Sequence, residues 1–179
     1  MKWLLIIGGA VVGLVVLVVI IGALLPRDHV ATVTARIPAP PDDVWHALTT
    51  PEAFPQWRPQ VARVEMLPPG PNGPSWREHS RNGAITMVVD AAEPPRHLVG
   101  RIADEKLPFG GYWDYRIEPD GVGASIVTIS EHGWVSNPLF RFVSRFIMGH
   151  TATLAEYLRA LGKKYGADTT PTVVADRER

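Results

Sequence analysis

Apolar residues form an unbroken run at the start of the chain. From Trp3 to Leu25 every residue is apolar or glycine, and none is charged. A helix of these 23 residues would be about 34 Å long, which is enough to cross the hydrocarbon core of a bilayer. A cleaved signal peptide has a shorter apolar region and a small residue two positions before its cleavage residue. The best cleavage residue is Ala23, which Ile21 precedes at that position, so residues 1–27 are predicted to be a retained single-pass anchor.

The flanks of this run carry little information on orientation. Lys2 precedes it, and Arg27 and Arg36 follow it, so the count of positive charges is nearly balanced. A short N-terminal anchor by default leaves the following domain outside the cytoplasm, and this is the orientation we expect. Gly9 and Gly13 form a GxxxG pair, which lets two helices approach closely. A weak dimer through these glycines is therefore a hypothesis, although glycine is common in spanning helices.

Beyond the anchor, apolar and polar residues alternate with a period of two, which is typical of half-buried strands. Residues 30–37 form the first predicted strand. Two short helices follow, over 41–49 and 51–57, each beginning at a proline. The remaining predicted strands cover residues 60–67, 75–81, 84–91, 96–104, 111–118 and 124–134. Asn82-Gly83 is a strong hairpin signal, and no helix separates these strands, so they predict an antiparallel sheet.

The last pattern is helical. Apolar residues recur every three or four positions from Pro138 to Tyr165, which predicts one helix of about 28 residues and about 42 Å. Asn137 is a candidate N-cap, and Gly166 is expected to end the helix. The polar residues 167–179 lack periodicity and are expected to be disordered. The folded domain is thus predicted to extend over residues 28–166.

Composition excludes several functions. Eighteen Lys and Arg balance eighteen Asp and Glu, and no basic face is evident, so we expect no nucleic acid as partner. The chain has no cysteine, which excludes disulfides and thiolate metal sites. Its six histidines do not occur in HxxxH or HExxH spacing, and it lacks GxSxG, P-loop and GxGxxG sequences. We therefore expect neither a metal site nor a cofactor.

Three stretches resemble a known superfamily. They are IPAPPDDVWHALTTPEAFPQWRP at 37–59, LPFGGYWDYRIEPDG at 107–121, and the segment 127–161. With the order of elements, they are similar to the START-like (SRPBCC) superfamily, and within it to polyketide cyclase/dehydrase-like members. The resemblance implies an α+β helix-grip (Bet v 1-like) fold, in which a curved antiparallel sheet surrounds a long C-terminal helix. It also implies a cavity between sheet and helix that binds an apolar small molecule or a lipid.

Strand phase and the helical stripe suggest which side chains would line such a cavity. Trp113 and Tyr115 share one strand face, whereas Phe146, His150 and Leu154 lie on the apolar stripe of the predicted helix. The alternative is that these residues only fill the core. The candidate ligand-binding residues are Trp76, Met87, Trp113, Tyr115, Glu131, Phe146, His150 and Leu154.

Two of the candidates are titratable. Glu131 shares a face with Val127 and Ile129, so it enters the cavity or its rim if that face points inward. A buried carboxylate can act as an acid or base or can anchor a polar group of a ligand. His150 lies on the apolar stripe and is a second acid–base candidate. The alternatives are a solvated or Arg-paired Glu131 and a core histidine.

Three functions are compatible with the sequence. The favoured hypothesis is a membrane-anchored module that binds a hydrophobic small molecule or lipid. The second is a cyclase or dehydratase with Glu131 and His150 as acid and base, since such catalysis depends largely on holding a reactive chain in a shaped pocket. The third is an accessory protein that interacts with a partner and has no ligand.

Overall fold

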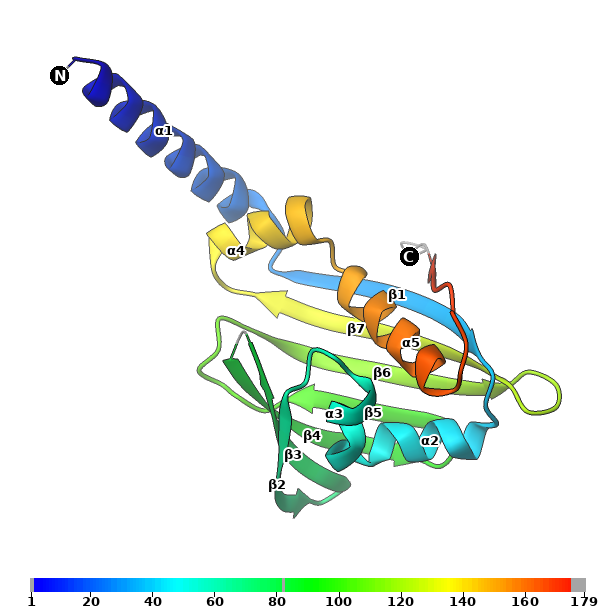
Figure 1. Cartoon of the computed structure of the whole chain (residues 1–179). Coiled ribbons are helices and arrows are strands. Elements are labelled where there is room, and N and C mark those ends of the chain that lie inside the picture. Colours follow the sequence, from blue (N-terminus) through cyan, green and yellow to red (C-terminus); the bar gives the residue numbers. More distant parts are fainter. Residues whose placement is uncertain (1, 82, 175–179) are drawn as a thin grey trace.

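The computed structural model describes residues 2–81 and 83–174, which form a curved sheet with a helix projecting from one end (Figure 1). All neighbouring strands are antiparallel, in the order β2-β3-β4-β5-β6-β7-β1-β8. The strands are β1 (Asp28–Ile37), β2 (Arg63–Gly70), β3 (Gly73–Ser80), β4 (Gly83–Glu93), β5 (His97–Ile102), β6 (Phe109–Pro119), β7 (Ser125–Val135) and β8 (Thr172–Val174). The predicted α+β fold class is confirmed.

Helices cover one face of the sheet. The helical elements are α1 (Lys2–Leu24), α2 (Pro41–Thr49), η1 (Pro51–Ala53), α3 (Phe54–Trp57), α4 (Pro138–Val143), the π-helical η2 (Ser144–Met148) and α5 (Ala152–Lys164). Helix α5 packs against β1 and β7, and α3 contacts α5 (Figure 1). The two short proline-initiated helices were predicted with nearly these bounds, because proline at the first turn fixes a helical φ and needs no hydrogen-bond partner.

The core lies between the inner face of the sheet and α5. Alternate residues of β1 point inward, and Val33 and Ile37 are completely buried there. From the helix, Leu154, Leu158 and Leu161 are also completely buried, one helical turn apart. This periodic burial of aliphatic side chains holds α5 against the sheet.

The predicted single helix over 138–165 is wrong. The chain leaves the helix at Gly149, whose φ of 73° is favourable only for glycine, and α5 begins at Ala152. Before the break, η2 forms a π-turn, and its Phe146 and Ile147 are exposed rather than packed in the core. One apolar periodicity therefore covers two segments with different neighbours, since α4 contacts α1 whereas α5 contacts the sheet.

The C-terminal segment also differs from expectation. Thr172–Val174 form β8, which pairs with Thr32–Thr34 of β1 and extends the sheet by one short strand. Upstream, the Thr169 hydroxyl donates to the Arg36 carbonyl at 3.3 Å. The prediction of disorder was thus wrong for residues 172–174, while residues 175–179 lie outside the described part of the chain. Gly166 does end α5, with φ 78°.

Both predicted limits of strand β2 differ from those in the structure. Strand β2 starts at Arg63 rather than residue 60, because Val61 N–H closes a turn onto the Arg58 carbonyl. It also extends to Gly70, so the turn before β3 is short. Ser80 pairs with Gly83 across the hairpin predicted at Asn82-Gly83, of which Asn82 lies outside the described residues.

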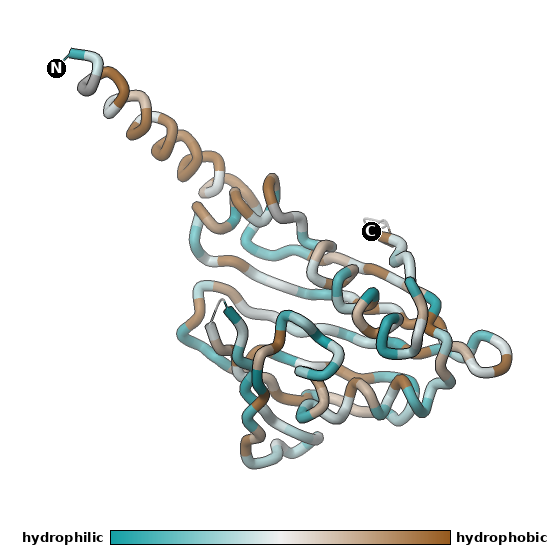
Figure 2. The backbone as a smooth tube through the Cα atoms, in the orientation of Figure 1, coloured by the Kyte–Doolittle hydropathy of each residue, from teal (hydrophilic) through white to brown (hydrophobic). Residues whose placement is uncertain are grey.

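The N-terminal helix is apolar on all sides. Residues Ile6–Leu24 are long and apolar enough to cross a membrane, and almost none of them is buried against the domain (Figure 2). A side chain at Gly9 or Gly13 would meet nothing within 4 Å, so this face of α1 is open. The dimer hypothesis stays a prediction.

Replacement of a core leucine on α5 tests the packing between helix and sheet. We expect Leu158→Ala to lower the free energy of unfolding by about 2–5 kcal/mol, because it leaves a cavity in a fully buried position. Urea denaturation followed by circular dichroism measures the change. Val122→Ala, at a fully exposed hairpin position, is the control and should change stability by less than about 0.5 kcal/mol. Equal effects of the two substitutions would contradict this packing.

Candidate functional site

A cavity of about 220 Å³ lies between the inner face of the sheet and the helices α3 and α5. Its wall is mostly apolar and aromatic, as is typical of ligand pockets. Five of the predicted residues line it: Trp76, Met87, Trp113, Tyr115 and Glu131. They come from four strands, and each points inward because its strand alternates between the two faces of the sheet.

Three predicted residues do not line this cavity. Leu154 is completely buried in the core beneath it. Phe146 lies on η2 with 59% of its surface exposed, because the break at Gly149 separates it from the core-facing helix. His150 lies within the break itself and lines a different cavity, next to the end of α1.

A buried ion pair forms one end of the cavity wall and was not predicted. The guanidinium of Arg58 donates to both carboxylate oxygens of Glu78, at 2.8 and 3.0 Å, and Trp76 Nε1 donates to the same carboxylate at 3.0 Å. Arg58 also lies 4.8 Å from the ring centres of both Phe54 and Tyr157. Burial alone would lower the pKa of Arg58, but Tyr157 and Glu78 outweigh this effect and raise it.

The sequence indicates the direction of the Glu78 side chain but not that of Arg58. Glu78 shares a strand face with Trp76, so its inward direction follows from the same alternation that located the tryptophan. Arg58 follows the last residue of α3, where no periodicity indicates a direction. Only the tertiary structure brings the two residues together across 20 positions of sequence.

Tyr157 is the centre of an aromatic cluster in the cavity wall. Its ring makes edge contacts with Trp57 and Trp113, at centroid distances of 5.4 and 5.6 Å, and lies 5.9 Å from Tyr115. Burial is the main reason that the pKa of Tyr157 rises to about 12, and it raises the pKa of Tyr115 well above its usual value. Both phenols therefore remain protonated near neutral pH and keep a hydrogen to donate.

Glu131 links the cavity between sheet and α5 to a pair of histidines. Its Oε1 lies 3.7 Å from His29 Nε2, and the His29 ring stacks on His150 with centroids 3.8 Å apart. The two predicted acid–base candidates thus lie in one cluster, with His29 between them. His29 was missed because the predicted strand began at residue 30, whereas β1 begins at Asp28 and places residue 29 on the inner face.

The environment of His150 disfavours its charged form. Burial is the largest cause of its lowered pKa, the nearby His29 lowers it further, and Glu131 opposes the shift. In the unfolded chain the imidazole therefore accepts a proton at a higher pH than in the folded protein.

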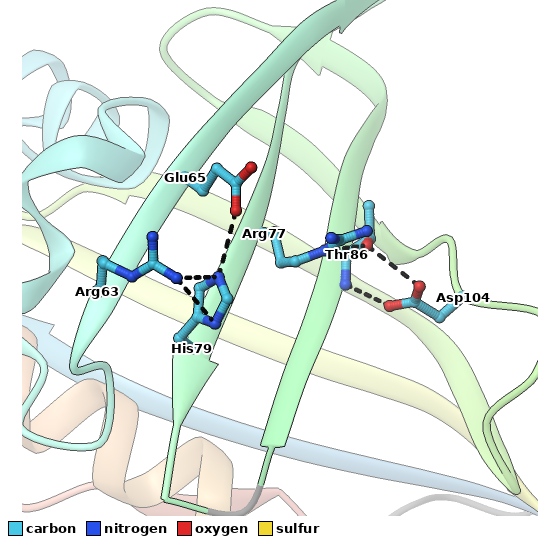
Figure 3. Close-up of polar contacts among 6 residues, drawn as sticks. All are labelled: Arg63, Glu65, Arg77, His79, Thr86 and Asp104. Carbon is cyan, nitrogen blue, oxygen red and sulfur yellow. Dashed lines mark hydrogen bonds and ion pairs between the residues drawn. The ribbon is translucent and has the colours of Figure 1, made fainter.

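The opposite face of the sheet carries polar groups away from the cavity (Figure 3). Arg63 Nη2 lies 3.1 Å from His79 Nε2, which lies 3.4 Å from Glu65, and Arg77 donates to the Thr86 hydroxyl at 3.3 Å. Exposed clusters of this kind contribute little to stability. Across residues 2–81 and 83–174, no three His, Asp or Glu side chains are arranged to hold a metal ion.

Removal of one partner of the buried ion pair should be strongly destabilising. We expect Arg58→Met to cost about 3–5 kcal/mol in free energy of unfolding, because the Glu78 carboxylate is left buried without its counter-charge. The double variant Arg58→Met/Glu78→Gln should recover part of this loss. Arg36→Met, in the exposed pair with Asp120, is the control and should cost less than about 1 kcal/mol. Urea denaturation measures the free energy of unfolding of each variant. A similar cost for Arg58→Met and Arg36→Met would contradict the structural importance of the buried ion pair.

Acidification should destabilise the fold through His150. Its pKa is lower in the folded than in the unfolded chain, so the unfolded state binds more protons as pH falls below the usual histidine value. Between about pH 7 and about pH 5, the wild-type chain should lose more stability than His150→Gln does. Urea denaturation at both pH values measures the difference. His46→Gln, at an exposed position on α2, should behave as the wild type does, and equal losses in all three proteins would contradict the prediction.

The fold is similar to those of several solved structures. A START superfamily protein from Mycobacterium smegmatis is 17% identical, with a TM-score of 0.62, over 76% of this chain and 97% of that one. A norcoclaurine synthase from Thalictrum flavum is 15% identical, with a TM-score of 0.61, over 77% and 94%. A conserved protein from Geobacillus kaustophilus is 13% identical, with a TM-score of 0.65, over 80% and 99%. At these identities the similarity concerns the fold.

Sequence comparison supplies the family. No curated protein sequence is significantly similar to the chain. The family model described as polyketide cyclase / dehydrase and lipid transport matches residues 28–163, which begin at the first residue of β1 and end within α5. With the fold of the START superfamily and this match over most of its length, the chain belongs to the polyketide cyclase / dehydrase and lipid transport family.

Proposed function

We propose that the protein is a membrane-anchored binding module, which holds a small amphipathic molecule in the cavity between sheet and α5. The observation that carries this proposal is the aromatic cavity with a charged pair in its wall. A core that served stability alone would gain from apolar residues in place of a buried ion pair, because the desolvation of two charges is costly. The polar groups are better explained by the recognition of a ligand.

The size of the cavity limits the ligand. A volume of about 220 Å³ lies below the usual range for drug-sized molecules. A small ring compound or a short acyl chain fits this space, whereas a complete two-chain phospholipid does not. The proposed ligand is therefore the size of a fatty-acid fragment or a small aromatic molecule.

The wall offers distinct partners for the two ends of such a ligand. Trp76, Met87 and Trp113 supply apolar contacts. The phenol of Tyr157, which accepts a hydrogen bond from Tyr115, is protonated and can donate one to a carbonyl or hydroxyl group. An amphipathic ligand satisfies both kinds of group.

The N-terminal helix supports the membrane part of the proposal. A span of 19 apolar residues, Ile6–Leu24, would fix the domain beside the bilayer as a single-pass protein. Apolar molecules concentrate in the bilayer, so a tethered cavity would meet them at high effective concentration. By the default for short N-terminal anchors, the domain would lie on the extracytoplasmic side.

Ligand recovery tests the proposal directly. The full-length chain is purified from membranes, and bound molecules are identified by native mass spectrometry and organic extraction. We expect one small amphipathic molecule per chain. A protein that is empty, and that also binds no member of a panel of fatty acids and small aromatic compounds, would overturn the proposal in favour of an accessory protein without ligand.

A cavity-filling substitution locates the binding place. A Cβ atom at Gly100 would lie 3.9 Å from Met87 and 4.0 Å from Tyr115, so Gly100→Val adds methyl groups inside the cavity. We expect it to lower ligand occupancy at least about tenfold, since even one added methylene is felt in a closely packed site. The neighbouring Val99→Ile, on the outer face of β5, is the matched control. Circular dichroism verifies folding of both, and full occupancy in Gly100→Val would place the ligand elsewhere.

The cluster of Glu131, His29 and His150 favours an enzyme as the second candidate, because it joins a carboxylate on the cavity wall to a chain of proton acceptors. Glu131→Gln distinguishes the two functions. In a binding module the variant carries the same molecule as the wild type, at similar occupancy. In an enzyme it carries a different, unconverted molecule, which organic extraction and mass spectrometry would reveal.

A further inference from the structure

A second cavity, of about 280 Å³, lies where α1 meets the folded domain. It begins at Leu25 and Pro26, immediately after the apolar span, and is closed from the other side by α4, η2 and His150. If α1 crosses a bilayer, this cavity lies within about one helical turn of the hydrocarbon boundary, at the depth of lipid headgroups.

The position of this cavity relative to α1 is fixed by close contacts. A Cβ atom at Gly22 would collide with the backbone of Pro138, so the two helices touch without an intervening side chain. Arg141 Nη1 donates to the Leu25 carbonyl at 2.8 Å and neutralises part of the negative end of α1. Val135 N–H donates to the Arg27 carbonyl at 2.9 Å. The domain is therefore held to the end of α1 by direct bonds.

Positive charge dominates the cavity. Arg27, Arg141 and Arg145 line it, against a single lining carboxylate, Asp28. None of these three arginines forms an ion pair with any residue that the structure describes. The Nη atoms of Arg141 donate to the backbone carbonyls of Leu25 and Ser136, whereas its Nε atom is buried and has no hydrogen-bond partner. A group of cations with an unsatisfied donor calls for an anion.

The flanks of the cavity are apolar and exposed. Leu139 and Phe140 on α4, and Phe146 and Ile147 on η2, have 43%, 53%, 59% and 72% of their surfaces exposed. Helix α4 packs against α1, and η2 follows α4 directly (Figure 1). Apolar side chains interspersed with arginines on one short helical segment are typical of elements that lie in a membrane interface.

From these observations we propose that the junction cavity binds the phosphate group of an anionic phospholipid, with Arg27, Arg141 and Arg145 as its ligands and the apolar side chains of α4 and η2 inserted beside it. The inference rests on the membrane anchoring in the proposed function but is independent of what the sheet cavity binds. Guanidinium groups suit phosphate because they can donate two parallel hydrogen bonds. The bilayer is the favoured source of the phosphate because the cavity lies at headgroup depth.

Lipid retention tests this site. The full-length chain is placed in nanodiscs of phosphatidylcholine with a minority of phosphatidylglycerol, and the lipids that stay bound after release are counted by native mass spectrometry. We expect one phosphatidylglycerol per chain, enriched over its share of the disc. Arg27→Gln/Arg145→Gln should reduce this occupancy roughly tenfold or more, because each basic residue near an anionic surface contributes about a fivefold gain in binding. Both side chains are exposed, so the variant should fold.

Matched controls distinguish the outcomes. Arg159→Gln/Lys163→Gln removes the same charge from exposed positions of α5 that do not line the junction cavity, and should retain the lipid. Loss of lipid in both double variants, or no enrichment in the wild type, overturns the site while leaving the sheet cavity untouched. Inorganic phosphate that binds in pure phosphatidylcholine discs without any phosphatidylglycerol enrichment overturns the lipid assignment. A chain that does not enter the discs overturns the anchoring and this inference together.

Discussion

The Arg58 guanidinium is buried in the wall of the cavity between the sheet and α5. Its need for a counter-charge constrains the residues around it. A buried cation is tolerated only with a counter-charge and full hydrogen bonding, and Glu78 meets that requirement with two bonds from β3. Because Arg58 follows α3 and its other side faces Tyr157 of α5, one side chain joins a strand, a short helix and the long helix. If β3, α3 or α5 moved relative to the other two, the charge of Arg58 or Glu78 would lose its partner within an apolar wall. The ion pair thus occupies part of the cavity wall where a core built for stability alone would carry apolar side chains.

The break at Gly149 has a comparable effect at the other end of the molecule. A continuous helix would have carried all of its apolar residues to the same neighbour. The positive φ of Gly149 instead lets α5 lie on the sheet while α4 and η2 turn towards α1. The same break frees His150 from the helix, so that its ring stacks on His29 near Glu131. The two cavities therefore meet at this cluster, with Glu131 on the wall of one and the two histidines on the wall of the other.

The two cavities differ in lining and are suited to different ligands. The sheet cavity is lined by aromatic residues and is suited to a small amphipathic molecule. The junction cavity is cationic and lies next to the span, where an anionic headgroup would be found. A hydrogen bond from Arg141 to the Leu25 carbonyl holds the domain against the end of α1. In the proposed membrane-anchored state, the exposed apolar residues of α4 and η2 would lie in the bilayer interface.

The sequence by itself determined the long apolar N-terminal helix, strands β1 to β7, the proline-initiated helices and five of the residues that line the cavity. Those features depend on local periodicity, which hydrophobic burial imposes on any helix or strand. The same alternation put Glu131 on one face with Val127 and Ile129, and the structure shows that this face points inward. Only the tertiary structure decided the partners: Arg58 with Glu78, His29 with His150, and β8 with β1. It also decided that a continuous helical pattern breaks at Gly149, because a glycine is compatible with both a helix and a left-handed turn. Period and phase are properties of neighbouring residues, whereas pairing across the fold depends on where distant segments pack.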